Sequence, residues 1–252
     1  MNKIAFITGA SAGIGKSCAE VFAREGFNLI LTARRLEKLE ELAEEIRNDF
    51  NVEVKAIQMD VRIKTEVQKG WESLPEEWKV VDLLINNAGL SQGLDPIFSG
   101  DTDDWDRMID TNIKGLLYIS RVILPQMKER KSGHVINIGS IAGREVYPNG
   151  NVYCATKHAV DALNKAMRID LLPYGIKVSA LNPGAVETEF SIVRFKGDKA
   201  RASRVYEGFE PLHAKDIAEA AWFVASRPQH VNINEMLVMP TAQANGTLFN
   251  KQ

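Results

Sequence analysis

The sequence predicts a single α/β domain, in which seven parallel strands form a doubly wound sheet with helices on both faces. Short apolar runs alternate along the chain with longer amphipathic stretches, which is the pattern of repeated strand–helix units. The short runs are apolar nearly throughout, as in strands that are buried on both faces. The length of 252 residues, with 45% hydrophobic and 25% charged residues, suits one large globular domain.

The strands are expected where β-branched and other apolar residues cluster in short runs. The first run ends at a glycine-rich turn, and the later ones are separated by stretches long enough for a crossover helix. The seven expected strands cover residues 3–8, 28–33, 53–59, 81–86, 133–138, 177–181 and 235–239.

Helices are expected between these strands, where apolar residues recur at a spacing of three or four. The stretch after the second strand has Leu, Ala and Ile on one face with Glu, Lys and Arg between them. The least regular stretch is 183–211, and its part from about 188 to 211 is expected to be a substrate lid. No linker or repeat interrupts the chain, so residues 1–252 are assigned to one domain. The main expected helices cover residues 36–46, 104–129, 152–171 and 214–226.

Composition excludes several classes of function. The net charge of −2 gives no positive field for nucleic acid or an anionic membrane. Cys18 and Cys154 form no C-x-x-C pair, and the four histidines lack ligand spacing, so no metal is expected. No apolar run approaches the roughly 20 residues of a membrane span, and the first run is too short for a signal peptide. A cytoplasmic protein is therefore expected.

The turn after the first strand has the composition of a phosphate cradle. Residues 8–15 read Thr-Gly-Ala-Ser-Ala-Gly-Ile-Gly and lead into a helix. Glycines permit the tight turn, close approach of the backbone to a pyrophosphate, and close packing of helix on strand. Free N–H groups at the start of the helix then face the phosphates. The spacing differs from G-x-G-x-x-G and an ordinary loop is the alternative, but the position after the first strand favours dinucleotide binding.

The end of the second strand indicates which dinucleotide binds. An NAD site usually carries an acidic residue there for the ribose 2′-hydroxyl, whereas this chain has Arg34 and Arg35, with no acid before Glu37. A guanidinium binds a 2′-phosphate through charge-assisted hydrogen bonds. The alternative is a solvated helix start, although cations there oppose the helix dipole. The sequence thus favours NADP over NAD, with Arg34 as the preferred contact.

A tyrosine and a lysine stand four residues apart in the helix expected over 152–171. Tyr153 and Lys157 therefore share one helix face. A tyrosine has a pKa of about 10, so a proton acceptor near neutrality needs a cation beside it, and Lys157 is the candidate. Ser140, after the fifth strand, could hydrogen-bond a substrate oxygen. The alternative is a surface tyrosine beside a solvated lysine.

Further motifs extend along essentially the whole chain in one order and spacing, and together they resemble the short-chain dehydrogenase/reductase family. This resemblance implies a Rossmann fold and an NADP-dependent oxidoreductase. It also implies cofactor contacts by Ser11, Arg34, Arg35 and Val186 in addition to the matched motifs. The matched residues are Thr8, Gly9, Gly13, Ile14, Gly15, Asp60, Val61, Asn86, Asn87, Ala88, Gly89, Asn112, Ser140, Tyr153, Lys157, Pro183, Gly184 and Thr188.

The resemblance also implies a mechanism. Tyr153 would pass a proton to or from the substrate oxygen while a hydride moves between nicotinamide and substrate carbon, and Ser140 would hold and polarise that oxygen. Lys157 would lower the pKa of Tyr153 and hold the nicotinamide ribose. Asn112 would position a water that links Lys157 to solvent.

Within the family, the chain is most similar to the NADP-dependent 3-hydroxy acid dehydrogenases. The similar segments are 73–78, 87–90, 188–191, 193–198 and 230–234, several of which are expected loops. A 3-hydroxy acid such as L-allo-threonine, serine or 3-hydroxypropionate needs a cation for its carboxylate. Arg194 in the expected lid is the first candidate and Arg144 the second; a mixed, solvated lid is the alternative.

Two other functions stay open from the sequence. One is reduction of a 3-oxoacyl thioester or another carbonyl with the same active-site residues, although the acidic start of the helix over 104–129 gives little support for a carrier-protein partner. The other is a catalytically silent NADP-binding sensor. The resemblance further implies a homotetramer that pairs through the helices over 104–129 and 152–171.

Overall fold

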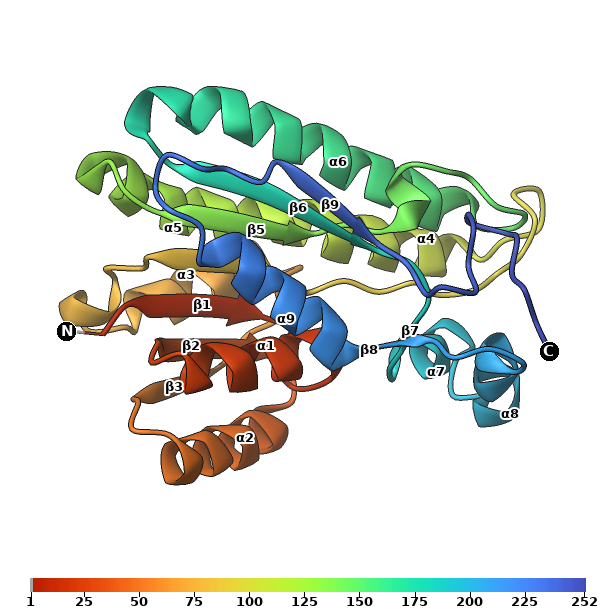
Figure 1. Ribbon diagram of the computed structural model, residues 1–252, viewed down its shortest axis with the longest axis horizontal. Helices are drawn as coiled ribbons and strands as arrows, with labels where there is room; N and C mark the ends of the chain where they lie inside the picture. The colour runs from red at the N-terminus through yellow and green to blue at the C-terminus, as the bar shows by residue number, and fades with distance from the viewer. Residues whose placement is uncertain (1) are drawn as a thin grey trace.

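The computed structural model describes residues 2–252 and contains one seven-stranded sheet, in which all strands are parallel (Figure 1). The strand order is β3-β2-β1-β4-β5-β6-β9, so the order reverses between β1 and β4. The predicted doubly wound sheet is confirmed, and each predicted run holds one of its strands. These are β1 Ile4–Thr8, β2 Asn28–Ala33, β3 Val54–Gln58, β4 Leu83–Asn86, β5 His134–Ile138, β6 Lys177–Pro183 and β9 Glu235–Val238.

Helices cover both faces of the sheet and bury two apolar clusters against it (Figure 1). On one face α1, α2 and α9 contribute side chains such as Phe22, Leu42 and Ile217. On the other face α3, α5 and α6 contribute side chains such as Ile123 and Val160. The helices are α1 Gly13–Arg24, α2 Leu36–Asp49, α3 Lys64–Glu72, α4 Thr102–Ile109, α5 Leu116–Arg130, α6 Asn151–Leu171 and α9 Ala214–Ala225.

The stretch predicted as one helix over 104–129 is interrupted. A π-helical turn, Asp110–Gly115, separates α4 from α5. A Cβ atom on Gly115 would lie 2.7 Å from Cγ2 of Val61, so this turn approaches the chain after β3 as closely as a glycine allows. The hydrophobic spacing of the sequence does not distinguish a widened turn from a regular one. The π turn contains Asn112.

The irregular stretch after β6 folds into short elements beside the carboxyl ends of the strands (Figure 1). Two-residue strands β7 Val186–Glu187 and β8 Leu212–His213 pair with each other outside the main sheet. Between them lie the short helices α7 Phe190–Arg194 and α8 Lys199–Ser203. This stretch holds the 188–211 segment expected from the sequence to be a lid.

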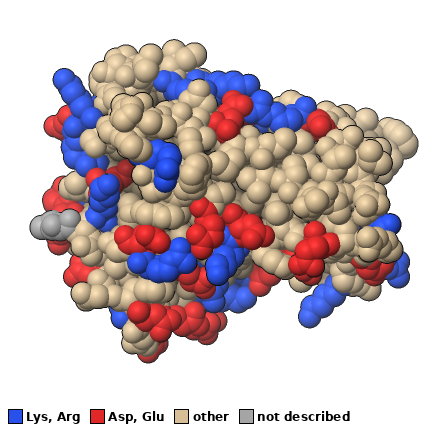
Figure 2. Space-filling view, viewed as in Figure 1, with Lys and Arg blue, Asp and Glu red and all other residues tan. Residues whose placement is uncertain are grey.

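Acidic and basic side chains lie side by side on the face shown in Figure 2. This mixture accords with the small net charge of −2. Among the residues described, no helix combines the length and apolar character that crossing a bilayer requires.

The end of β1 is tied to the chain that follows β4, at the point where the strand order reverses. The Thr8 Oγ1 accepts hydrogen bonds from the backbone N–H groups of Asn87 and Ala88, both at 2.9 Å. In return, the Asn87 side-chain amide donates to the Thr8 carbonyl oxygen at 2.8 Å. One buried hydroxyl thus fixes two loops that border the same crevice.

Replacement of Thr8 by Val keeps the shape of the side chain but removes the acceptor of both N–H groups. We expect the free energy of unfolding to fall by about 2 kcal/mol, measured by urea denaturation. Thr32→Val is the matched control, because Thr32 is equally buried and pairs with Thr8 in the register of β1 and β2. Its hydroxyl donates only one long bond, 3.5 Å to Ile7 O. Equal losses in the two variants would contradict this account.

Candidate active site

A cavity of about 360 Å³ opens along the carboxyl ends of the strands. Its walls come from the turn after β1, the residues after β2 to β6, and the start of the 188–211 segment. Most of the residues predicted from the sequence meet here. Those that line the cavity are Gly9, Ser11, Gly13, Ile14, Arg34, Arg35, Asp60, Val61, Asn87, Ala88, Gly89, Ser140, Tyr153, Lys157, Pro183, Gly184, Val186 and Thr188.

The glycine turn between β1 and α1 has the geometry of a phosphate cradle. Gly9 and Gly13 adopt positive φ angles of 66° and 54°, which disfavour other residues. Gly15 lies outside the cavity lining, but a Cβ there would be only 2.4 Å from the Gly9 carbonyl oxygen. Gly15 therefore allows α1 to start directly against the turn, and the free N–H groups of that start face the cavity.

Basic side chains gather where β2 ends. The Arg35 guanidinium donates to Oγ of Ser11 in the glycine turn, at 3.2 Å from Nε and 3.1 Å from Nη2. Among residues 2–252 no acidic side chain forms an ion pair with Arg34, which lines the same part of the cavity. Arginines and a serine at this place, without a carboxylate from β2, fit the phosphate on an adenosine ribose.

Asp60 lies at the end of β3 and is held by Arg62, whose guanidinium Nε donates to both carboxylate oxygens at 3.0 Å. Burial acts to raise the pKa of Asp60, but hydrogen bonds from Arg62 and the charge of Arg34 outweigh it and lower the pKa. Asp60 is thus an ionised hydrogen-bond acceptor on the cavity wall. Arg62, which also lines the cavity, was not among the predicted residues.

Tyr153, Lys157 and Ser140 meet over the start of α6. Tyr153 and Lys157 lie one turn apart, with Lys157 Nζ 6.0 Å from the centre of the Tyr153 ring. Lys157 Nζ also donates to the Ile138 carbonyl oxygen at 2.9 Å. Ser140 lies in the loop after β5, and its Oγ accepts the Ala142 N–H at 3.1 Å. A tyrosine hydroxyl, a serine hydroxyl and an ammonium group therefore share one wall of the cavity.

Burial governs the ionisation of Tyr153 and Lys157. It lowers the pKa of Lys157 to about 8 and raises the pKa of Tyr153. The charge of Arg194, followed by the Ser140 hydroxyl, acts in the other direction and favours the tyrosinate. The sequence assigned this influence on Tyr153 to Lys157. That assignment stays a prediction, and the structure adds Arg194 as a second cation near the Tyr153 ring.

Asn112 is occupied by hydrogen bonds within the protein. Its amide oxygen accepts the Leu90 N–H, and its Nδ2 donates to the Leu90 carbonyl oxygen, both at 2.8 Å. Nδ2 also donates to Oγ1 of Thr156 at 3.0 Å. Asn112 therefore joins the loop after β4 to α6, next to Lys157. The water-holding role implied by the family resemblance stays a prediction.

Of the two candidate cations for a substrate carboxylate, only Arg194 lies near Tyr153. Its guanidinium carbon is 5.3 Å from the centre of the Tyr153 ring. Neither arginine is among the residues that line the cavity, and Arg144 forms ion pairs with Glu235 and Asp161. The structure therefore does not bring Arg144 to the site, because two carboxylates already hold it elsewhere.

Arg194 has an unusual set of partners. Its Nε donates to Oγ of Ser91 at 3.1 Å and its Nη2 to the Tyr147 hydroxyl at 2.9 Å. Phe190 packs against it, with the guanidinium carbon 5.1 Å from the ring centre. Within residues 2–252, no carboxylate forms an ion pair with this half-buried cation. A guanidinium held by neutral groups beside Tyr153 retains its charge for an anion.

Sequence reasoning did not select Ser91, Tyr147 or Phe190 as site residues. Ser91 and Tyr147 lie in loops without regular spacing, so no pattern marks them. Phe190 directly follows Thr188 and Glu189 and was part of a similar segment, but its contact with Tyr153, 5.6 Å between ring centres, depends on the fold of α7.

Comparisons with known proteins agree with this geometry. The model of the family described as short chain dehydrogenase matches residues 3–198. The NADP-dependent 3-hydroxy acid dehydrogenase of Salmonella typhi is 45% identical over 242 residues, 96% of each chain. Sulfoacetaldehyde reductase 2 of Chromohalobacter salexigens is 43% identical, with 97% of this chain and 96% of the relative covered.

A solved structure, the closed form of a serine dehydrogenase complexed with NADP+, superimposes with a TM-score of 0.93 at 42% identity, over 99% of both chains. This chain belongs to the short-chain dehydrogenase family. The family and the Rossmann-type fold predicted from the sequence are therefore confirmed.

The buried lysine gives a test of the site through stability. Because the pKa of Lys157 falls from 10.5 to about 8 on folding, the unfolded chain binds more protons between these values, and the wild-type protein gains stability as the pH rises. Lys157→Met lacks this gain. We expect the difference in unfolding free energy between wild type and variant to change by up to about 3 kcal/mol between pH 8 and 10.5.

Urea denaturation at several pH values measures this difference, and the variant should be at least as stable as the wild type at pH 7. Lys165→Met is the control, because Lys165 lies on the same helix with its side chain 48% exposed. A pH-dependent difference of the same size in the control would contradict the assignment to Lys157.

Proposed function

We propose that this protein is an NADP-dependent dehydrogenase that acts on the hydroxyl-bearing carbon of a small 3-hydroxy acid, such as serine, L-allo-threonine or 3-hydroxypropionate. The observation that carries the proposal is Arg194, a half-buried guanidinium without an acidic partner within residues 2–252, 5.3 Å from the Tyr153 ring. A carboxylate bound there lies one short carbon chain away from the Tyr153 hydroxyl. Relatives named as 3-hydroxy acid and serine dehydrogenases support this substrate class.

The proton chemistry is assigned to the residues that share the cavity wall. Tyr153 takes the hydroxyl proton of the substrate during oxidation and returns it during reduction. Ser140 orients the same oxygen. NADP supplies the hydride chemistry when bound. Arg194 binds the carboxylate and, by its charge, favours the ionised form of Tyr153. Lys157, with its pKa lowered to about 8, can give up and regain a proton near neutral pH.

The cofactor assignment depends on the residues around the glycine turn. Gly9 and Gly13, with their positive φ angles, form the turn assigned to the pyrophosphate, and Arg34, Arg35 and Ser11 form the pocket assigned to the 2′-phosphate. Asp60 and Val61 are assigned to the adenine end of the dinucleotide. Residues 87–89 and 183–188 are assigned to its nicotinamide end. Relatives that are named for NADP or complexed with it support this cofactor.

A sulfonate is the second candidate anion. An arginine held by neutral groups binds any planar or tetrahedral oxyanion, and one relative at 43% identity is named a sulfoacetaldehyde reductase. Both candidates share the same reaction centre and differ only in the anionic group on Arg194. A thioester reductase and a silent NADP-binding sensor are the outcomes if neither anion is turned over.

We also propose a cytoplasmic homotetramer. Exposed apolar residues on α5 and at the end of α6, namely Leu117, Ile169 and Leu172, support contacts between subunits. Sedimentation equilibrium measures the state of assembly.

Turnover should require Tyr153 and NADP+. With NADP+ and a panel of L-serine, L-allo-threonine and 3-hydroxypropionate, we expect NADPH formation, read at 340 nm, and much slower formation of NADH from NAD+. Tyr153→Phe should reduce kcat by about 10²- to 10⁴-fold while the affinity for NADPH, measured by fluorescence titration, stays close to that of wild type. Tight NADPH binding without turnover of any acid would overturn the substrate class.

Arg194→Leu tests the carboxylate contact. Loss of a charge-assisted pair should reduce kcat/KM for 3-hydroxypropionate about ten- to hundredfold more than for 1,3-propanediol. The diol lacks the carboxylate and shares only the part of the loss that comes from the effect of Arg194 on Tyr153. Arg201→Leu is the matched control, because Arg201 lies in the same segment and packs on Phe195. A similar loss on the acid and on the diol would remove Arg194 from substrate recognition.

A further inference from the structure

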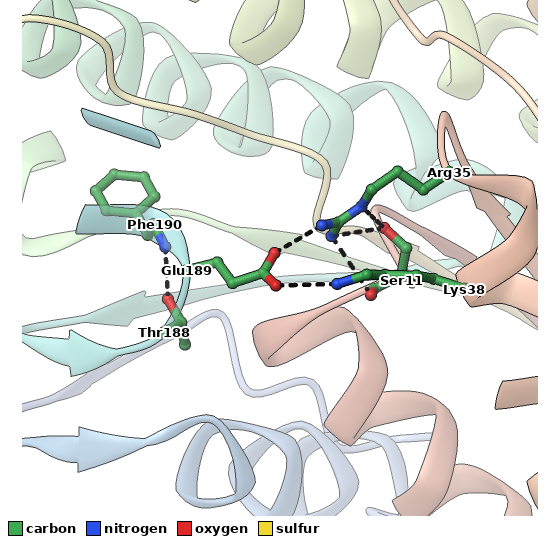
Figure 3. Close-up of polar contacts among 6 residues, drawn as sticks. All are labelled: Ser11, Arg35, Lys38, Thr188, Glu189 and Phe190. Carbon is green, nitrogen blue, oxygen red and sulfur yellow. Dashed lines mark hydrogen bonds and ion pairs between the residues drawn. The ribbon is translucent and has the colours of Figure 1, made fainter. Parts of the chain in front are cut away.

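A carboxylate of the 188–211 segment spans the mouth of the cavity. Glu189 points across it toward the start of α2, where Arg35 Nη1 donates to one carboxylate oxygen at 2.8 Å and Lys38 Nζ to the other at 3.2 Å (Figure 3). Neither the fold nor the proposed chemistry requires this three-residue contact. We call Glu189, Arg35 and Lys38 the clasp.

The clasp joins two walls of the cavity. Glu189 and its neighbours Thr188 and Phe190 line one side, and Arg35 and Ser11 line the other. On the first side, the Thr188 hydroxyl accepts the Phe190 N–H at 3.2 Å, which fixes the backbone around Glu189 (Figure 3). On the second side, the contact of Arg35 with Ser11 fixes the guanidinium. Glu189 and Arg35 are thus each held by a further hydrogen bond on their own side of the cavity.

The charges of the clasp are unequal. Two cations face one carboxylate, and burial, which by itself raises the pKa of Glu189, is outweighed by hydrogen bonds from Arg35 and Lys38, so the pKa is lowered. Glu189 is therefore ionised at neutral pH. The Arg35 guanidinium donates to Ser11 through Nε and Nη2 and to Glu189 through Nη1. It can therefore bind a phosphate beside Ser11 while Nη1 stays paired with the Glu189 carboxylate.

We propose that Glu189 retains the dinucleotide: by pairing with Arg35 and Lys38 it fastens the 188–211 segment over the cofactor cavity and slows the release of NADP(H). This inference rests on the proposed NADP site but is independent of the substrate. A dinucleotide in the cavity lies between the two walls, and the clasp must open before the walls can separate. Lys38 does not line the cavity, so its effect on release comes only through Glu189.

The rate of NADPH dissociation tests the proposal directly. NADPH bound to the full-length protein is displaced by excess NADP+ in a stopped-flow instrument, and its fluorescence is followed without substrate. Exposed ion pairs have modest energies, so we expect Glu189→Gln to release NADPH about two- to fivefold faster than wild type. Lys38→Gln should also accelerate release, and the double variant should be no faster than Glu189→Gln alone, because both changes open the same contact.

Glu187→Gln is the matched control: Glu187 is exposed two residues before Glu189, and no ion pair to it occurs within residues 2–252. Its release rate should equal that of wild type. A wild-type rate in Glu189→Gln overturns the clasp, as does equal acceleration in Glu187→Gln, which indicates a general effect of charge. A wild-type rate in Lys38→Gln overturns the three-residue clasp, because the Arg35–Glu189 pair would then hold the segment without Lys38. Failure of the wild-type protein to bind NADPH contradicts the cofactor assignment instead.

Discussion

Where β1 ends, three stretches of backbone meet without room for a side chain. Gly15 at the start of α1 lies against the Gly9 carbonyl, and the Asn87 amide fills the remaining space at the end of β4. The Thr8 hydroxyl closes this contact by accepting two N–H groups. Because β1 and β4 are the strands between which the order reverses, the crevice opens here. The glycine turn and the adjoining part of the cavity wall, at Asn87 and Ala88, depend on this one close approach.

The electrostatics of the catalytic wall are arranged for ligands and not for the protein alone. Burial favours neutral forms of both Tyr153 and Lys157, yet each has a polar neighbour: Tyr153 the Arg194 charge, Lys157 the Ile138 carbonyl. Arg194 is held by two hydroxyls and by the Phe190 and Tyr153 rings, and it loses hydration without a counter-ion within residues 2–252. The arrangement becomes favourable when an anion pairs with Arg194. In the proposed function, the carboxylate of the substrate would supply the counter-ion that Arg194 lacks among residues 2–252.

The sequence predicted the sheet, most helices and most of the cavity lining because these depend on local pattern: apolar runs, glycines in a turn, and a tyrosine one helical turn from a lysine. What it could not predict are contacts set by distant parts of the chain. The sequence alone gives Arg144 and Arg194 the same chemistry, and only the fold shows that Asp161 and Glu235 form ion pairs with Arg144. Glu189 and Arg35, which form an ion pair, lie 154 residues apart in the sequence. The π turn at Asn112 has the same hydrophobic spacing as the helix it interrupts.

The attachments of the 188–211 segment differ in kind from those of the sheet. Only Ser191 and Ala202 of its residues are buried, so apolar burial contributes little to holding it in place. Besides the contact of Phe190 with Tyr153, its side chains reach the rest of the protein through polar contacts: Glu189 to α2, Arg194 to Ser91, and Lys196 to Asp104 in α4. The ion pairs of Glu189 are exposed and can exchange for water at small cost, whereas the buried strands cannot separate without loss of the core. If the 188–211 segment acts as the lid that the sequence predicts, its opening would leave Tyr153 and Lys157 in position, because both belong to α6, which packs on the sheet.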